Sequence, residues 1–337
     1  MKPERAAAAR AFLDVAGWKG AQVEVLTADA SFRSYHLVTL GPKVALLMDA
    51  PPEHEKPAAF QQVAELLVSL ELSAPRIYAA DLETGFLLIE YFGERTFTRA
   101  LAAGADERAL YQLATDTLIV LHRRWDPALG AWLPSFDTQN LPAETELFLD
   151  WMFPALRGKR ADDLMRERFQ DAWKEVLPAA FALPPTLVLR DYHVDNMMVL
   201  ADRPGVMACG LLDFQDALLG SPAYDLVSLL QDARRDVSPE LEAAMLERYC
   251  IAFPEMDQRL FEEAYWVLGA QRTIRILGVF VRLDRRDGKP VYLNHIPRLW
   301  RLLDRLLARP ELAPVAAWFE RYLPASAREA SLKGVAA

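Results

Sequence analysis

The chain has 337 residues, enough for two domains or for two lobes of one larger domain. Hydrophobic residues make up 52% and charged residues 25%, the balance of an ordinary globular protein that can bury a core. The net charge of −9 argues against a nucleic-acid partner, because binding to phosphate backbones requires a basic surface. The sequence also gives no sign of a protein partner.

Cysteine usage and hydropathy indicate the compartment. Cys209 and Cys250 are the only cysteines, which excludes a disulfide framework, and neither lies at a metal-ligand spacing. The first 18 residues carry charges and lack the apolar segment of a secretion signal. The most apolar long stretch, residues 264–283, is interrupted by Arg272 and Arg275 and is too polar to span a membrane. We therefore expect a cytoplasmic protein that does not bind membranes.

The first 92 residues have the pattern of a small mixed α/β unit. Short apolar runs at residues 23–26, 35–40, 44–48 and 86–89 predict strands, and apolar residues at helical spacing predict a helix over residues 60–68. Residues 29–31 form a polar connection between the first two strands. The sequence thus predicts a sheet with one helix in this region.

Residues 93–337 have a mainly helical pattern. Apolar residues at 110–121 repeat as an amphipathic stripe, and further helices are expected from about residue 143 and from Pro222 almost to the end. The only strand-like runs in this part lie at residues 187–189, 197–200 and 208–212. We therefore expect a larger helical region that contains three short strands.

The densest cluster of chemically useful residues lies between these three strands. Asn196 follows Asp191 by five positions, and an apolar strand ends at Asp213, seventeen positions later. This is the spacing of a kinase catalytic loop, in which the carboxylate takes the proton of an acceptor hydroxyl and the amide oxygen reaches Mg²⁺. Asp213 occupies the place of a second metal-binding group.

Each part of this cluster is weak evidence when it is taken alone. An aspartate and an asparagine five positions apart, such as Asp191 and Asn196, are often found by chance in unrelated sequences. An aspartate at a strand end, such as Asp213, is usually a turn former or a helix cap. The combination is more specific, because all three residues follow or precede predicted strands in the expected order. The sequence therefore favours phosphoryl transfer to a hydroxyl group.

Several segments resemble the aminoglycoside-phosphotransferase/choline-kinase superfamily. They are residues 190–196, 213–216 and 220–222, followed by Asp225 and Leu226. Residues 29–35, 48–53, 271–272 and 285–290 look more specifically like the bacterial anomeric kinases of N-acetylmuramate and N-acetylglucosamine. The resemblance covers about residues 20–305 and implies an α+β, two-lobed protein-kinase-like fold. The N-lobe would then comprise residues 1–92, with a mixed sheet, and the mainly helical C-lobe residues 93–337.

The resemblance also implies an activity. It implies an ATP-dependent kinase that phosphorylates the anomeric hydroxyl of either sugar, with Asp191 as the catalytic base and Asn196 and Asp213 as Mg²⁺ ligands. The sugar 1-phosphate would feed UDP-sugar synthesis in peptidoglycan recycling. Two alternatives stay open: a kinase for another acceptor such as an aminoglycoside, choline or homoserine, and a nucleotide-binding pseudokinase.

The resemblance further indicates where ATP would bind. The loop over the phosphates and the interlobe hinge for adenine would be formed by Ser31, Phe32, Arg33, Glu90, Tyr91 and Phe92. The loop has no glycines, so backbone N–H groups, Ser31 and Arg33 would contact phosphate. The alternatives are an ordinary hairpin turn for the loop and a solvated strand end for Glu90.

The third predicted strand departs from the kinase pattern. Where a lysine would pair with the α- and β-phosphates, residues 44–48 offer only apolar side chains. Arg33 or Lys56 could supply the missing cation, or Mg²⁺ could carry more of the charge. The absence also keeps the pseudokinase alternative open.

The acceptor side has two candidate groups. Arg272, Arg275 and Arg282 fall within a narrow sector of one predicted helix, and could bind the N-acetylmuramate carboxylate through bidentate bonds. Glu144 and Asp150 could bind sugar hydroxyls. The alternatives are a solvated arginine face and an acidic surface helix.

Overall fold

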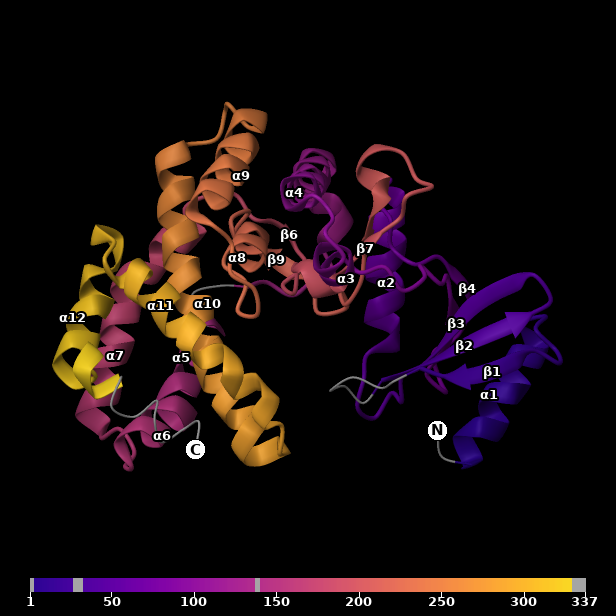
Figure 1. The fold of residues 1–337 in the computed structure, drawn as a ribbon, viewed down its shortest axis with the longest axis horizontal. Helices are drawn as coiled ribbons and strands as arrows, with labels where there is room; N and C mark the ends of the chain where they lie inside the picture. Colours follow the sequence, from indigo (N-terminus) through magenta and orange to yellow (C-terminus); the bar gives the residue numbers. More distant parts are fainter. Residues whose placement is uncertain (1–2, 27–32, 137–139, 329–337) are drawn as a thin grey trace. The chain divides into compact units, whose positions relative to one another are not determined.

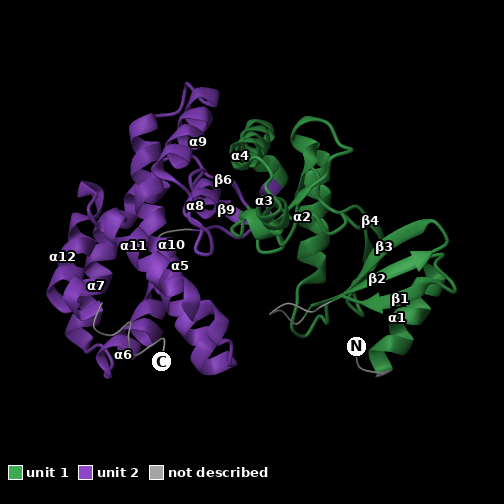
Figure 2. Ribbon diagram, viewed as in Figure 1, with its two compact units in different colours: residues 1–129, 189–217 green, residues 130–188, 218–337 purple. Residues whose placement is uncertain are grey.

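The computed structural model describes residues 3–26, 33–136 and 140–328. The chain forms two compact units, the first of residues 1–129 and 189–217 and the second of residues 130–188 and 218–337 (Figure 2). The chain therefore returns to the first unit after residue 188. As a result, Asp191 and Asp213 belong to the same unit as the N-terminal sheet.

The first unit begins with helix α1 (Pro3–Val15) and an antiparallel sheet of order β1-β2-β3-β5-β4 (Figure 1). Its strands are β1 (Gln22–Val25), β2 (Ser34–Leu40), β3 (Lys43–Asp49), β4 (Ile77–Asp81) and β5 (Phe86–Ile89). The four strands predicted in this region are confirmed. The edge strand β4 was not predicted, because its five residues include no fully buried side chain and so lack an apolar pattern.

The core of this sheet follows from strand periodicity. Alternate residues of adjacent strands, Val38, Ala45 and Leu47, are fully buried and pack with Leu13 of α1 and with Trp18. Burial of each large apolar side chain contributes about 1.5–3 kcal/mol, and α1 supplies the cover for this face. The sheet is thus a rigid base for the loops that leave its strands.

The rest of the first unit consists of helices and a hairpin. They are α2 (Pro57–Ser69), α3 (Phe97–Ala102), α4 (Glu107–Arg124), β7 (Met197–Val199) and β8 (Cys209–Leu211). The helices predicted over residues 60–68 and 110–121 are confirmed as α2 and α4. Asp106 caps the start of helix α4, because its side chain accepts a hydrogen bond from the Ala109 N–H. The helix buries its predicted apolar stripe.

The second unit is mainly helical, as predicted (Figure 1). Its helices are α5 (Asn140–Leu147), α6 (Phe153–Arg157), α7 (Asp163–Val176), α8 (Tyr224–Leu230), α9 (Pro239–Ala252), α10 (Gln258–Asp287), α11 (Ile296–Leu307) and α12 (Ala313–Tyr322). A small sheet pairs β6 (Thr186–Val188) with β9 (Leu218–Gly220). Expecting only three strands after residue 93 was wrong. β9 has three residues and is defined by pairing with β6, not by a local pattern.

Helix α10 is the centre of the second unit. Gly278 lies against Leu147, and a Cβ atom added there would come within 2.4 Å of the Leu147 carbonyl carbon and oxygen. Glycine is therefore required for this close packing of α10 on the end of α5. A π-helical turn, Phe148–Met152, follows directly and also packs on α10. Such turns are frequent at functional sites.

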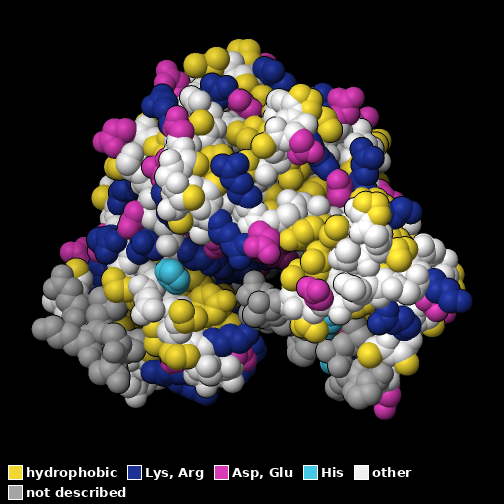
Figure 3. All heavy atoms as spheres, turned by 45° about the vertical axis from the view of Figure 1, so that its right-hand side comes forward, with side chains coloured by type: hydrophobic (Ala, Val, Ile, Leu, Met, Phe, Trp, Pro, Cys, Tyr) yellow, Lys and Arg dark blue, Asp and Glu magenta, His cyan; other side chains and the backbone are white. Residues whose placement is uncertain are grey.

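The surface agrees with the composition. Acidic and basic side chains are interspersed over the face in Figure 3, as expected from 47 acidic and 38 basic residues. In the described ranges, no helix combines the length and the apolar character that a membrane span requires.

Candidate active site

The loop that leads into β7 has a strained start. Arg190 has φ +70°, a left-handed conformation that is uncommon for a residue other than glycine. The Asp191 N–H then donates to the Leu189 carbonyl at 2.9 Å. The Tyr192 hydroxyl donates to the Ala114 carbonyl of α4 at 2.8 Å, which fixes the loop to a buried helix. Backbone strain of this kind persists only where the surroundings enforce it, and it is common at active sites.

Asp191 and Asn196 are joined across this loop. The Asn196 side-chain Nδ2 donates to the Asp191 carbonyl at 2.9 Å, so the amide oxygen of Asn196 remains for another partner. The Asp191 carboxylate is half-buried, and no hydrogen bond to it occurs within the described residues. A carboxylate in this state can accept the proton of a bound hydroxyl group.

Asp213 follows β8 and also has a left-handed backbone, with φ +56°. The Leu212 N–H donates to the Asn196 carbonyl at 3.0 Å, and Asn196 Nδ2 lies 3.5 Å from Asp213 Oδ2. The Phe214 ring stacks on Phe60 of α2, with ring centroids 5.0 Å apart. The β7–β8 hairpin therefore brings Asp191, Asn196 and Asp213 together, and Phe214 fixes their loop to α2.

The predicted phosphate loop is described only in part. Ser31 and Phe32 lie outside the described residues, which resume at Arg33 directly before β2. The Ser34 hydroxyl lies 3.1 Å from His36 Nε2.

Arg33 is bound to the Asp213 loop. Its Nη2 donates to Asp213 Oδ1 at 2.7 Å, its Nη1 donates to Gln215 Oε1 at 2.5 Å, and its Nε lies 3.4 Å from Glu55. Burial opposes the charged form of Arg33, but the neighbouring Tyr35, Asp213 and Glu55 outweigh it, so the pKa of Arg33 is raised. A permanent cation thus lies beside the Asp213 carboxylate.

The third strand carries no lysine after its first residue, as the sequence indicates. Asp49 at its end is buried and accepts a hydrogen bond from Arg5 Nε of α1 at 2.8 Å. Lys56 precedes α2, is exposed and makes no capping hydrogen bond. Of the two cations considered as replacements, Arg33 is therefore the one that contacts Asp213.

In the segment after β5, the Glu90 side chain is held by an ion pair, and the peptide groups of Tyr91 and Phe92 are available for hydrogen bonds. The Glu90 N–H donates to the Arg76 carbonyl at 2.9 Å, and the Glu90 carboxylate forms an ion pair with Arg203. Glu90 is thus a bound residue and not a solvated strand end. Within the described part of the chain, no hydrogen bond uses the backbone N–H or C=O groups of Tyr91 and Phe92. These backbone N–H and C=O groups can form hydrogen bonds with the edge of a planar heterocyclic base.

In the second unit, the acidic and basic candidates form two ion pairs. Arg275 Nε of α10 lies 3.2 Å from Glu144 of α5, and Gln271 Nε2 lies 3.4 Å from the same carboxylate. Asp150 of the π-helical turn accepts a hydrogen bond from Arg166 of α7 at 2.5 Å. The structure therefore joins Arg275 to Glu144 and leaves Asp150 in a separate pair.

Arg272 has a different environment from Arg275. It is buried, its Nη2 donates to the Ser228 hydroxyl of α8 at 2.7 Å, and its guanidinium carbon lies 5.9 Å from the Tyr224 ring centre. Arg282 is half-buried, and burial followed by the charge of Arg286 lowers its pKa. The three arginines of the predicted stripe therefore do not share one solvated face.

Three residues with contacts at this site were not among the sequence candidates. Glu55 and Gln215 bind Arg33, and Arg203 binds Glu90. Only Gln215 had a local signal, because it lies two positions after Asp213. Glu55 and Arg203 lie in segments whose pairing with the site depends on the tertiary fold.

The arrangement defines a class of enzyme. A carboxylate that can accept a proton, two oxygen donors of the type that Mg²⁺ prefers and a nearby guanidinium group are the parts of a phosphotransferase site. The chain belongs to the phosphotransferase enzyme family, whose family model matches residues 22–260. It is accordingly a kinase that uses a nucleotide.

Curated relatives are similar over most of their length. The chain is 38% identical to the N-acetylmuramate/N-acetylglucosamine kinase of Caulobacter vibrioides, over 97% of this chain and 99% of that protein. It is 36% identical to the protein of the same name from Pseudomonas aeruginosa, over 85% of this chain and 84% of that protein.

Solved structures show the fold. A ternary complex of an aminoglycoside phosphotransferase with streptomycin and ATP matches at a TM-score of 0.61 and 15% identity, over 91% of this chain and 98% of that chain. An ethanolamine kinase of Plasmodium vivax matches at a TM-score of 0.58 and 11% sequence identity, over 84% of this chain and 82% of that chain. The predicted aminoglycoside-phosphotransferase-like fold, with an antiparallel N-terminal sheet and a mainly helical remainder, is confirmed.

Proposed function

We propose that this kinase transfers the γ-phosphate of ATP to the anomeric hydroxyl of N-acetylmuramate and N-acetylglucosamine. The sugar 1-phosphate would then feed UDP-sugar synthesis in the recycling of peptidoglycan in the cytoplasm. The observation that carries this proposal is 38% identity over nearly the full length of a kinase named for both sugars. The half-buried Asp191 carboxylate, which has no partner among the described residues, supports catalysis over a binding-only role.

Asp191 is the proposed catalytic base. Its carboxylate takes the proton of the sugar hydroxyl while the sugar oxygen forms a bond to the γ-phosphorus and the bond to the β–γ bridging oxygen breaks, releasing ADP. The left-handed Arg190 and the Tyr192–Ala114 hydrogen bond keep this carboxylate in position. Little covalent chemistry is needed beyond orientation and proton acceptance.

Asn196 and Asp213 are the proposed holders of Mg²⁺. The donor set fits this ion, because Asn196 uses its amide nitrogen on Asp191 and Asp213 contributes carboxylate oxygens. Few protein ligands suffice, since Mg²⁺ in such enzymes also binds substrate phosphates and water. When bound, the ion would neutralise charge on the phosphates.

Arg33 is the proposed replacement for the missing third-strand lysine. Its contacts with Glu55 and Asp213 resemble those of the kinase lysine, which pairs with a glutamate and the phosphates. Ser31 and Phe32 would complete the phosphate contacts, and the backbone at Glu90, Tyr91 and Phe92 would bind adenine.

Glu144, Asp150, Arg272 and Arg275 are the proposed sugar-site residues. Arg275 would contact the lactyl carboxylate of N-acetylmuramate directly, since it is half-buried and arginine binds carboxylates through paired N–H groups. Arg272 is buried against Ser228, so its proposed contribution is to position α8 and α10.

An acceptor screen with phosphorus NMR tests the proposal. The purified chain, Mg²⁺ and ATP should convert both amino sugars to products whose phosphate is attached at the anomeric carbon. Choline, homoserine and kanamycin serve as competing acceptors. Turnover of kanamycin without turnover of either sugar would overturn the assignment, and no turnover of any acceptor would favour a pseudokinase.

A further inference from the structure

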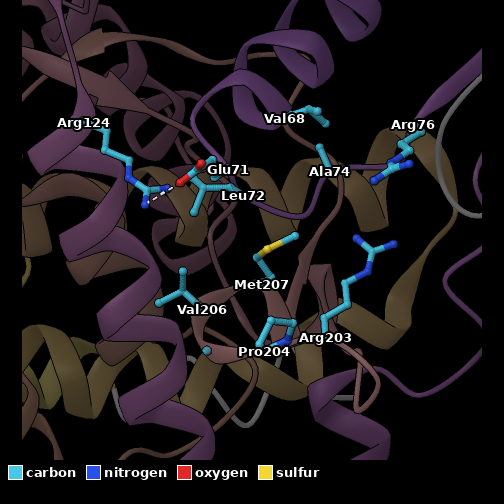
Figure 4. A pocket seen from close by; sticks show the side chains of 11 residues that line it. Val68, Glu71, Leu72, Ala74, Arg76, Arg124, Arg203, Pro204, Val206 and Met207 are labelled. Carbon is cyan, nitrogen blue, oxygen red and sulfur yellow. Dashed lines mark ion pairs between the residues drawn. The ribbon is translucent and has the colours of Figure 1, made fainter.

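A pocket lies in the first unit, and it is lined by none of the residues assigned above to catalysis. Its volume is about 540 Å³ (Figure 4). It is lined by the end of α2, the segment that joins α2 to β4, the last turn of α4 and the loop between β7 and β8. This volume is within the usual range for small-molecule sites.

The charged groups of this pocket are mostly basic. Arg76, Arg124 and Arg203 line it together with one carboxylate, Glu71. Arg124 pairs with Glu71 at 2.7 Å on one side, whereas Arg76 and Arg203 lie on the other side with their guanidinium groups turned toward each other (Figure 4). The Arg76 guanidinium has no carboxylate partner among the described residues.

Two converging guanidinium groups repel each other unless an anion lies between them. Arg203 forms an ion pair with Glu90, whose other carboxylate oxygen accepts a hydrogen bond from the Arg76 backbone N–H at 3.3 Å. Glu90 thus contacts the Arg76 backbone, and within the described residues the Arg76 guanidinium forms no ion pair with it. A phosphate group is suited to this position, because its several oxygens can accept paired N–H bonds from both arginines. The remaining walls are largely apolar and include Leu72, Val206 and Met207.

We propose that this pocket binds a small phosphate ester, with the phosphate between Arg76 and Arg203 and an apolar or ring-shaped body against the apolar walls. The combination of a few charged groups with apolar walls is typical of specific small-molecule sites. The proposed binding of a phosphate ester depends only on this pocket and not on the proposed sugar kinase reaction.

Arg203 connects the pocket to the segment after β5. Its Nη1 donates to Ser73 Oγ at 2.9 Å, its guanidinium carbon lies 5.0 Å from the Phe92 ring centre, and it forms the ion pair with Glu90. A phosphate that binds Arg203 weakens the ion pair between Arg203 and Glu90. Glu90 directly precedes Tyr91 and Phe92, whose peptide groups are available for hydrogen bonds. Occupancy of the pocket therefore changes nucleotide affinity, and this second step rests on the proposed function.

Phenyl phosphate is a suitable probe, because it combines a single phosphate with an apolar ring. Titration calorimetry of the full chain, with ADP saturating the nucleotide site, should show saturable binding of one equivalent. Arg76→Gln should weaken this binding on the order of tenfold or more, the loss expected for a hydrogen-bonded charge. Arg76 is exposed, so the variant should fold, and a thermal melt checks this.

A charge-matched variant controls the titration. Arg259→Gln removes an exposed arginine from α10 in the second unit and should bind phenyl phosphate as the wild type does. Equal weakening in Arg259→Gln would show non-specific attraction and overturn the proposal. Normal binding in Arg76→Gln, or no saturable binding at all, would also overturn it.

The coupling has a separate measurement. Because coupling between two sites is reciprocal, saturating phenyl phosphate should change the ADP dissociation constant by about fivefold or more in the wild type. ADP should change the phenyl phosphate affinity by the same factor. Unchanged ADP affinity would overturn the coupling, while the Arg76→Gln titration decides the binding site independently. Failure of the acceptor screen would affect neither titration.

Discussion

The Arg33 guanidinium donates to Asp213 Oδ1 at 2.7 Å, and Gln215 donates to the same oxygen at 3.1 Å. The proposed Mg²⁺ ligand therefore already has a positive partner, which holds the segment before β2 next to the end of β8. Because the Asp213 side chain is 39% exposed and Arg33 only 11%, the arginine is the better enclosed member of the pair. In the proposed function, Mg²⁺ and ATP would compete with Arg33 and Gln215 for this carboxylate.

Arg33 should contribute more to nucleotide use than Lys56. Arg33→Gln removes a hydrogen-bonded cation from the phosphates, so kcat/KM for ATP should fall by about 10–100-fold, equivalent to about 1.5–3 kcal/mol. Lys56→Gln is the matched control and should stay within twofold, because Lys56 is exposed. Steady-state kinetics at varied ATP concentration checks both variants, and a larger loss in Lys56→Gln would assign the phosphate cation to Lys56.

Asp191 should be required for proton acceptance. Asp191→Asn keeps the shape of the side chain but removes its basicity, so we expect kcat to fall by about 10²–10⁴-fold. Asp195→Asn, in the same loop, is the control, because the Asp195 side chain is bound to Thr98 of α3. Turnover of Asp191→Asn within threefold of the wild type would contradict the assignment.

Asp213 should be required for Mg²⁺-dependent nucleotide binding. Ligand at 100 times its dissociation constant stabilises a protein by about 2.7 kcal/mol, so Mg-ATP should raise the melting temperature of the wild type measurably. Asp213→Ala should lose this increase, and its own melting temperature should fall by only a few degrees, because the pair with Arg33 is partly exposed.

Asp216→Ala is the control for this thermal-shift measurement. Asp216 is exposed and belongs to the same segment, so its replacement should leave the Mg-ATP shift intact. An unchanged shift in Asp213→Ala would exclude Asp213 as a metal ligand. Asn196→Ala should behave as Asp213→Ala does, since both residues are proposed to hold the same ion.

The sequence was informative where candidate site residues lie close together along the chain. Asp191, Asn196 and Asp213 belong to loops joined by one hairpin, so their convergence could be predicted from spacing and strand pattern, while their roles stay predictions. The contact of Arg33 with Asp213 spans 180 positions and could not be predicted, because nothing local encodes how β2 meets the end of β8.

The arginine stripe shows a second limit of sequence patterns. Spacing alone placed Arg272 and Arg275 on one face of a helix, which is correct geometrically, but it could not say what covers that face. Helix α10 is packed by several elements, so Arg272 is buried against α8 while Arg275 meets α5. Helical periodicity predicts which residues share a face, and only tertiary packing decides which of them reach a ligand.

Arg275 should discriminate between the two proposed sugars. N-acetylmuramate carries a lactyl carboxylate that N-acetylglucosamine lacks, and a guanidinium group binds a carboxylate through charge-assisted hydrogen bonds of about 1.5–3 kcal/mol. Arg275→Ala should therefore raise KM for N-acetylmuramate by about tenfold or more and change KM for N-acetylglucosamine much less. Arg286→Ala is the control, because Arg286 lies exposed near the end of the same helix and pairs with Asp287.

Arg272→Ala should give a different result from Arg275→Ala. Removing a buried arginine that binds Ser228 costs stability, so the melting temperature should fall and both sugars should be used less well. Competitive kinetics with both sugars in one reaction, together with thermal melts, separates the two arginines. Equal losses for both sugars in Arg275→Ala, without loss of stability, would show that Arg275 does not contact the lactyl group.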